Sequence, residues 1–309
     1  MQYINVNYKK SNLLNLKKIK NKIVIGTAQL STDYGIANFT NKKFSKKKTF
    51  SFLDYCLANN FLDFDTAHGY SNEKIIGEFL KKNFIKKKIK IISKIPSMTT
   101  VPNKKKIKFI NSSINKTLNN LNNNLNTILF HDQRDTSFVL KNFNEIKNII
   151  RVKKIKNIGF SIYDLKYYEM IKKKIKKDKL VIQLPINIVN DKFVKKKYPK
   201  NFDIHVRSIF LQGLLVNKKI KKKMNKKYII LHKEYFSYLE KNCINPFELC
   251  FEIIKNKDYK KFIIGFDDID QIKYLLNLNK QKKNNFKKNV LEIKKMFKNT
   301  NINDPRKWI

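Results

Sequence analysis

Three short apolar runs of this sequence each end in an ionisable residue. FLDFD ends in Asp65, IKIISK ends in Lys94 and TILFH ends in His131, while Tyr70 follows Asp65 by five residues. A carboxylate, an ammonium group, an imidazole and a phenol that meet in space form a proton-donor assembly, which can polarise a carbonyl group and protonate its oxygen. The hydride for such a reduction has to come from a bound cofactor.

The phenol is the natural proton donor of this set, although its ordinary pKa near 10 is high for donation at neutral pH. A nearby ammonium group lowers the pKa of a phenol because it stabilises the phenolate. We therefore expect Lys94 to lower the pKa of Tyr70. Asp65 is expected to keep Lys94 charged and in place, and His131 to hydrogen-bond the substrate carbonyl.

These side chains can act together only if the ends of their runs meet. Short apolar runs alternate with longer helical patterns from about residue 23, a rhythm typical of βα units and a parallel sheet. The strand-like runs are IVIGTA from Ile23, FLDFD from Phe61, IKIISK from Ile89, TILFH from Thr127, IKNIGFS from Ile155, LVIQLP from Leu180, DIHVRS from Asp203 and KFIIG from Lys261. Helices are expected at about 45–59, 72–82, 105–121, 137–152, 164–177, 226–242, 246–255 and 269–278, with a short one near Lys192.

Eight such units predict an α/β fold, a single (β/α)8 TIM barrel. We expect one domain over residues 1–309 with its barrel core at about 23–280, an N-terminal extension of 22 residues and a C-terminal helix near 285–298. The GxGxxG and GxxxxGK[ST] phosphate loops of open sheets are absent. In such barrels function lies at the carboxyl ends of the strands, and neighbouring strands are about 4.8 Å apart, so the three run-ending residues can converge.

Residues 61–77, FLDFDTAHGYSNEKIIG, resemble the aldo/keto reductase signature, in which D-T-A is followed by five residues, E, two residues, an aliphatic residue and G. Other landmarks follow in the family's order over about residues 23–280: GTAQL with Tyr34-Gly35, Ser93-Lys94, Leu129-Phe130-His131, Gly159-Phe160-Ser161, Gln183 with Pro185 and Asn187, and IIGFDDIDQI from Ile263. The resemblance implies an NAD(P)H-dependent carbonyl reductase. Its catalytic residues would be Asp65, Tyr70, Lys94 and His131, with Tyr70 as general acid.

The same resemblance implies a set of cofactor-binding residues. Ser161 and Gln183 would hold the nicotinamide carboxamide. The other candidates are Gly26, Thr27, Arg207, Ser208, Gly265 and Gln271. Two departures from the family's pattern lie here, because Ile162 stands where many members have Asn, and Arg207 replaces the aromatic residue that commonly stacks on the nicotinamide ring. Phe210 or Phe160 could replace that aromatic residue.

The choice of dinucleotide depends on the end of the last strand. Many family members hold the 2′-phosphate of NADPH there with a Lys or Arg and a hydroxyl residue, whereas this chain has Gly265, Phe266, Asp267 and Asp268. Two carboxylates would repel a phosphate dianion unless neighbouring Lys residues offset them. The resemblance favours NADPH, and the carboxylates leave NADH open.

Plainer interpretations of single residues exist. Asp65 could cap a strand end, Lys94 could be a surface cation and Tyr70 a half-buried rim aromatic, but their joint spacing favours catalysis. The other histidines form no HxH or HExxH pair, so no metal site is predicted.

HVRSIFLQGLL resembles a bacterial branch of the family associated with surface-sugar pathways, a hint of a sugar-like substrate. The alternative function is a catalytically weak nicotinamide-binding regulatory protein of the same fold.

Charge suggests a polyanion partner at first sight, since 68 Lys and Arg face 24 acidic residues, a formal net charge of +44. The excess is almost all Lys and accompanies abundant Asn and Ile, whose codons are rich in A and T, so compositional drift of the genome accounts for it at least as well. We expect a small-molecule carbonyl substrate and no specific nucleic-acid partner, while the oligomeric state stays open.

The cysteines and the apolar segments bear on location. Cys56, Cys243 and Cys250 show no CxxC spacing and are expected to be buried apolar residues in a reducing compartment. No stretch approaches the roughly 18 apolar residues of a membrane span, and no signal peptide is recognisable. The prediction is a soluble, cytoplasmic protein without a membrane partner.

Overall fold

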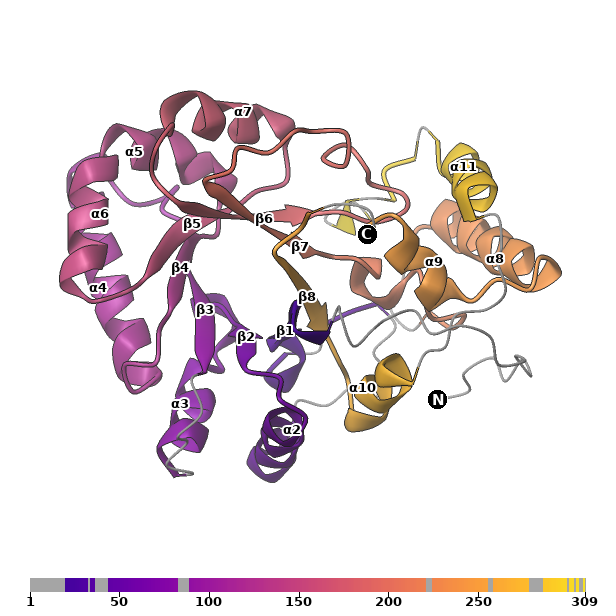
Figure 1. Cartoon of the computed structure of the whole chain (residues 1–309), viewed down its shortest axis with the longest axis horizontal. Coiled ribbons are helices and arrows are strands. Elements are labelled where there is room, and N and C mark those ends of the chain that lie inside the picture. Colours follow the sequence, from indigo (N-terminus) through magenta and orange to yellow (C-terminus); the bar gives the residue numbers. More distant parts are fainter. Residues whose placement is uncertain are drawn as a thin grey trace.

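The computed structural model of the chain describes residues 20–32, 34–36, 44–82, 89–220, 224–254, 258–277, 286–298, 300–302, 304–305 and 308. Eight parallel strands close into a barrel in the order of the sequence (Figure 1). They are β1 (Ile23–Gly26), β2 (Asp63–Asp65), β3 (Lys90–Ile95), β4 (Thr127–Phe130), β5 (Asn157–Ser161), β6 (Leu180–Pro185), β7 (Phe202–Arg207) and β8 (Lys261–Gly265). The predicted TIM barrel is confirmed, and each strand coincides with a predicted run.

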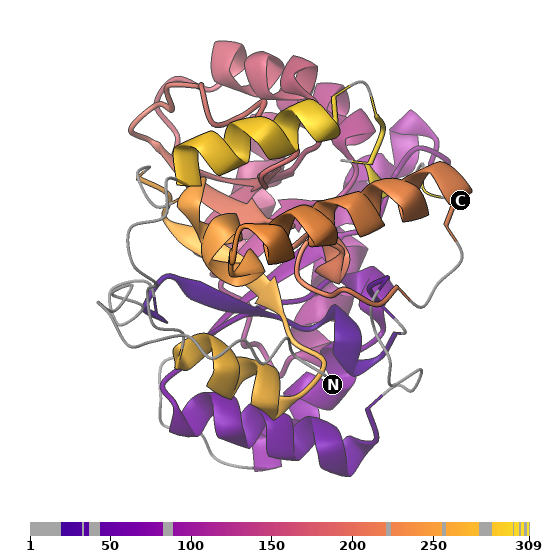
Figure 2. The same ribbon diagram turned by 90° about the vertical axis from the view of Figure 1, so that its right-hand side faces the viewer.

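Helices surround the barrel, as Figures 1 and 2 show. They are α2 (Lys46–Ala58), α3 (Glu73–Lys82), α4 (Asn103–Asn120), α5 (Thr136–Lys141), α6 (Phe143–Val152), α7 (Leu165–Lys174), α8 (Lys226–Lys241), α9 (Pro246–Glu252), α10 (Ile269–Leu276) and α11 (Phe286–Met296). The helix expected at 137–152 is divided into α5 and α6 at Asn142. The predicted C-terminal helix is α11, and the Tyr238 hydroxyl on α8 donates to Asn289 on it.

One predicted helix is wrong, because residues 192–195 form turns. The Val194 N–H donates to the Asp191 carbonyl and the Lys196 N–H to the Phe193 carbonyl, so the chain tightens without completing a helix. Phe193 is fully buried against Tyr168 on α7, which explains why a single turn suffices to anchor this connection. Of the expected N-terminal extension, residues 1–19 lie outside the described residues.

A layer of apolar side chains fills the inside of the barrel: Val24, Ile92, Leu129 and Val181, with Ile263 packed against them. Side chains alternate along a strand, so the residue two positions later faces the same side, nearer the carboxyl end. In these five cases the later residue is Gly26, Lys94, His131, Gln183 or Gly265. Strand alternation therefore places predicted site residues directly above the apolar layer.

Of the three cysteines, Cys56 and Cys250 are buried as expected, and Cys243 is exposed. The prediction for Cys243 is wrong because it lies in the turn after α8, where its positive φ of 50° belongs to the chain reversal before α9.

Candidate active site

A cavity of about 370 Å³ opens at the carboxyl ends of the strands. It is the place where side chains above the apolar layer meet, as expected for a barrel of this kind. All twelve predicted site residues line it: Gly26, Thr27, Asp65, Tyr70, Lys94, His131, Ser161, Gln183, Arg207, Ser208, Gly265 and Gln271.

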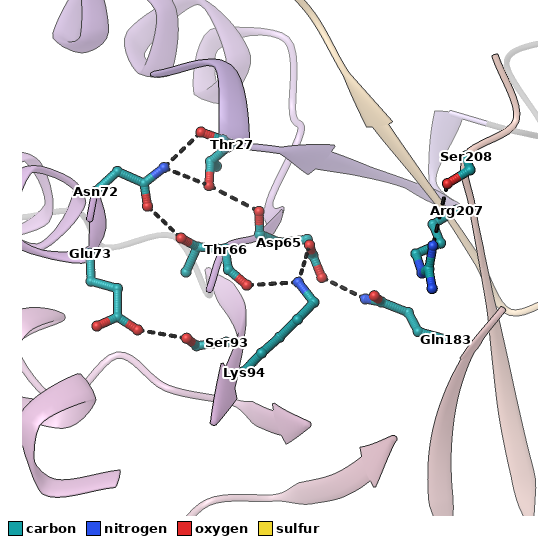
Figure 3. A network of polar contacts seen from close by, with 10 residues as sticks. All are labelled: Thr27, Asp65, Thr66, Asn72, Glu73, Ser93, Lys94, Gln183, Arg207 and Ser208. Atoms are coloured by element: carbon teal, nitrogen blue, oxygen red, sulfur yellow. Dashed lines mark hydrogen bonds and ion pairs between the residues drawn. The ribbon is translucent and has the colours of Figure 1, made fainter. Parts of the chain in front are cut away.

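A buried ion pair lies at the floor of the cavity (Figure 3). Lys94 Nζ is 2.5 Å from Asp65 Oδ1 and donates a second hydrogen bond, of 2.8 Å, to the Thr66 carbonyl. Gln183 Nε2 donates to the other oxygen of Asp65 at 2.5 Å. Burial lowers the pKa of Lys94, and the Asp65 carboxylate opposes that shift. The contact expected between Asp65 and Lys94 is thus present.

Buried hydrogen bonds hold the backbone that carries Asp65. The N–H and the hydroxyl of Thr27 both donate to the Asp65 carbonyl at 3.0 Å, which joins β1 to β2. Asn72 Nδ2 donates to the Thr27 carbonyl at 2.7 Å, while the Thr66 hydroxyl donates to Asn72 Oδ1. Thr27 borders the cavity, and its hydroxyl also belongs to this scaffold.

The acidic residue and the glycine of the signature have structural tasks. Glu73 is buried and accepts hydrogen bonds from the Ser93 hydroxyl at 2.6 Å, the Thr117 hydroxyl at 3.0 Å and Asn120 Nδ2 at 3.1 Å. A Cβ on Gly77 would lie 1.9 Å from the Asn120 carbonyl oxygen, so only glycine permits this approach of α3 to α4. Both residues fix α3 behind β2 and β3.

Tyr70 lies beside the ion pair, in the short 3-10 helix His68–Tyr70 that follows β2. Lys94 Nζ is 5.5 Å from the centre of its ring. The pKa of Tyr70 is nevertheless raised above its ordinary value, first by burial and then by the Asp65 carboxylate, with Arg207 opposing. The expectation of a lowered pKa for Tyr70 is wrong, because burial and the Asp65 carboxylate outweigh the positive charges around the phenol. A raised pKa keeps the phenol protonated, which is the form a general acid needs.

His131 follows β4, and its ring is 6.4 Å from that of Tyr70 in an edge-to-face arrangement. The imidazole borders the cavity, yet the surrounding protein lowers its pKa to about 3 through desolvation, helped by the charges of Lys94 and Arg207 and opposed by Asp132. His131 is therefore neutral at physiological pH. A neutral imidazole with one N–H can hydrogen-bond an acceptor without delivering the proton itself.

Gln183 carries a polar atom that no protein group satisfies. A carboxylate oxygen only accepts, so the Gln183 amide has to turn its Nε2 toward Asp65 and its Oε1 away. This Oε1 is buried and has no hydrogen-bond partner. Ser161 is the register partner of Gln183 on the adjacent strand and lines the same cavity. An amide group with N–H donors fits this corner of the site.

The end of β8 carries the carboxylates that the sequence singled out. Asp268 caps α10 by accepting the Gln271 N–H at 2.8 Å, and Gln271 Nε2 donates to Asp267 Oδ2 at 3.1 Å. Gly26 and Gly265 are paired in register, and both line the cavity. A Cβ on Gly265 would lie 2.2 Å from Gln29 Nε2, so the glycine makes room for the Gln29 side chain, which also lines the cavity.

Tyr163 is a cavity residue that the sequence analysis missed. It comes two positions after Ser161, so the alternation of β5 continued past its end was the available signal. The Arg207 guanidinium carbon lies 4.0 Å from the centre of the Tyr163 ring. Of the two candidates for the missing aromatic residue, Phe210 lines the cavity, whereas Phe160 is buried on the other face of its strand.

No group of three or more His, Cys, Asp or Glu side chains within the described ranges could hold a metal ion. None of the described helices is long and apolar enough to cross a membrane.

Comparisons with known proteins identify the family and the fold. The sequence model of the Aldo/keto reductase family matches residues 22–289. Aldo-keto reductase AKR11C1 from Bacillus halodurans superimposes with a TM-score of 0.66 at 15% identity, covering 93% of this chain and 96% of its own. Glycerol dehydrogenase AKR11B4 from Gluconobacter oxydans gives 0.59 at 14% identity, with 95% and 94% covered.

These structural likenesses show the shared fold, and none of the curated proteins matches the chain. Since the family match spans most of the sequence, the chain belongs to the aldo/keto reductase family, whose members are oxidoreductases that reduce carbonyl groups with NAD(P)H.

Proposed function

We propose that this protein reduces an aldehyde or a ketone to an alcohol with a nicotinamide dinucleotide, and that Tyr70 donates the proton. The observation that supports this most strongly is the meeting of Asp65, Lys94, His131 and a protonated Tyr70 around one cavity. A reduced nicotinamide bound there supplies the hydride to the carbonyl carbon, and the phenol proton goes to the carbonyl oxygen.

Each of these four residues has its own role in the proposed reduction. The neutral His131 hydrogen-bonds the carbonyl oxygen and orients it toward the Tyr70 hydroxyl. When Tyr70 gives up its proton, a phenolate forms, and the positive charge of Arg207 stabilises it. Asp65 keeps the Lys94 ammonium in position through the 2.5 Å contact.

The cofactor fits the corner at Gln183, because Oε1 of this residue is buried and has no acceptor task in the protein. We assign the carboxamide to Gln183 and Ser161. The remaining lining that a dinucleotide would contact consists of Gly26, Thr27, Arg207, Ser208, Gly265 and Gln271. Family likeness favours NADPH, and the carboxylate of Asp267 at the cavity wall favours NADH, which lacks the 2′-phosphate.

The test starts with binding. Purified protein is titrated with NADPH and with NADH while nucleotide fluorescence and the thermal midpoint are followed, because a ligand of the folded state raises that midpoint by mass action. Dinucleotide oxidation is then measured with aldehydes, ketones and reducing sugars, the last because HVRSIFLQGLL suggests a sugar-like substrate. We expect saturable binding and turnover. Binding without any turnover would support the regulatory alternative, and binding of neither dinucleotide would contradict the proposal.

A further inference from the structure

Arg207 is a cation in the cavity that is not one of the four residues Asp65, Tyr70, Lys94 and His131. It is the last residue of β7 and pairs with Pro185 in register, two positions beyond the pair His205 and Gln183. Its side chain therefore belongs to the inward face of the sheet, one step closer to the mouth than Gln183. In Figure 3, Arg207 and Gln183 lie on the same side of Asp65.

The guanidinium is poorly satisfied by the protein. Its Nε is buried and has no hydrogen-bond partner among the described residues. Its Nη1 is 3.4 Å from the Ser208 hydroxyl and its Nη2 is 3.4 Å from the Ile162 carbonyl, both at the weak limit for hydrogen bonds. A guanidinium offers five N–H donors, and buried charged groups are normally paired. Arg207 therefore has N–H donors that make weak hydrogen bonds or none to the described residues, and its side chain borders the cavity.

The positive charge of Arg207 has no carboxylate partner within the described part of the chain. Among the ion pairs of the described residues, none includes Arg207. Both oxygens of Asp65 already accept hydrogen bonds, from Lys94 and Gln183. The other carboxylate that lines the cavity, Asp267, follows β8, the strand next to β7, and accepts from Gln271. Arg207 is thus the cation of the cavity that forms no ion pair with any described residue.

The ring of Tyr163 packs against the Arg207 guanidinium. The guanidinium carbon lies 4.0 Å from the ring centre, the distance of a stacked cation–π contact. Stacking uses the face of the guanidinium and leaves the edge with Nε and one Nη free to meet two oxygens in parallel, as carboxylates and phosphates require. A lysine ammonium offers no such edge.

We propose that Arg207 makes this enzyme selective for carbonyl compounds that carry an anionic group, a carboxylate or a phosphate, close to the carbonyl. The inference deepens the proposed function and rests on it. The anionic oxygens pair with the Nε and Nη edge of Arg207, while the carbonyl reaches Tyr70 and His131. Arg207 is then the specificity-determining residue of the site.

The test compares two pairs of substrates: para-formylbenzoate against para-formylbenzamide, which differ in charge and hardly in size, and glyceraldehyde 3-phosphate against the smaller, neutral glyceraldehyde. The quantity measured is the ratio of kcat/KM between the charged and the neutral member of each pair. We expect wild-type protein to favour the charged member, and Arg207→Gln to reduce this preference about tenfold to a hundredfold, the scale of hydrogen bonds to charged groups. The loss should appear mainly in KM, and Arg207→Lys should recover part of it.

The matched control is Arg151→Gln. Arg151 is exposed on α6, away from the cavity, so this variant removes the same charge from a protein of net charge +44 without touching the site. Its selectivity should equal that of the wild type. Thermal midpoints of all variants verify that they fold.

The possible results of this test distinguish a failure of the inference about Arg207 from a failure of the proposed reductase function. Turnover with equal selectivity in wild-type and Arg207→Gln protein would overturn the inference and leave the reductase assignment intact. Weaker dinucleotide binding in Arg207→Gln with unchanged selectivity would assign the guanidinium to the cofactor phosphates and also overturn it. No turnover of any carbonyl compound by the wild type would overturn both.

Discussion

The buried pair of Asp65 and Lys94 offers the sharpest test of how the site is held together. Asp65 is 4% exposed and Lys94 2% exposed, so neither charge has water to compensate it. Asp65→Asn keeps the shape of the side chain and removes its charge. The ammonium of Lys94 would then have only neutral acceptors, the Thr66 carbonyl and the amide oxygen introduced at position 65, and no negative charge to balance it.

The expected size of the effect follows from burial. Removing one partner of a buried ion pair costs about 3–5 kcal/mol, whereas an exposed pair contributes about 0–1 kcal/mol. Asp178, which pairs with Lys147 on the surface, provides the control Asp178→Asn. The unfolding entropy of a chain of 309 residues converts these costs into a lower thermal midpoint of about 5–8 °C for Asp65→Asn and under about 2 °C for Asp178→Asn.

A double-mutant cycle with Lys94→Met identifies the cause. If the loss comes from an uncompensated ammonium, the double variant, which has neither charge, should be more stable than Asp65→Asn alone. Thermal and urea unfolding of the protein without dinucleotide measure all four forms. Equal losses for Asp65→Asn and Asp178→Asn, or a double variant no more stable than Asp65→Asn, would refute the reasoning.

Three further predictions concern pH, cofactor and charge. Burial, with Lys261 and Lys260 adding to it, lowers the pKa of His205 from 6.5 to about 3, so the unfolded chain binds more protons between these values and stability falls as pH falls through this window. His205→Gln should remove about 2 kcal/mol of the loss between pH 7 and pH 5 in urea unfolding, and an unchanged pH dependence would count against it. Asp267→Asn should raise the affinity for NADPH relative to NADH roughly tenfold, because one repelling charge is lost. In the same titrations, the exposed control Asp270→Asn should leave the ratio of the two affinities unchanged. Equal affinity ratios in both variants would reject this prediction. Binding to DNA should be weak, independent of sequence and abolished by salt, so a preference for one duplex in competition assays would contradict the expectation of no specific nucleic-acid partner.

Much of the fold was predictable because its signals are local. Every strand coincides with an apolar run, and the rule that alternate side chains share a face put Lys94, His131 and Gln183 above the apolar layer Ile92, Leu129 and Val181. A short helix was predicted in place of the turn at residues 192–195, because several polar residues around a single buried aromatic residue resemble a short amphipathic helix in sequence.

The electrostatics of the site were less accessible to sequence reasoning. The direction of the Tyr70 pKa shift depends on burial and on the charges around the phenol, two properties of the assembled structure. Tyr163 was overlooked because it lies beyond the last residue of β5, and its role emerged only from its contact with Arg207. Arg207 departs from the family's sequence pattern, so that pattern gives no indication of Tyr163, the residue that contacts it.

The central claim is that Tyr70 gives its proton to a carbonyl oxygen in this cavity. The most direct measurement is dinucleotide oxidation at saturating dinucleotide and carbonyl substrate for wild-type protein and Tyr70→Phe, with the fluorescence titration repeated on both. The account predicts that the variant binds the dinucleotide as the wild type does and loses turnover by at least about 10²-fold, the share of a general acid. An undiminished rate in Tyr70→Phe would contradict it.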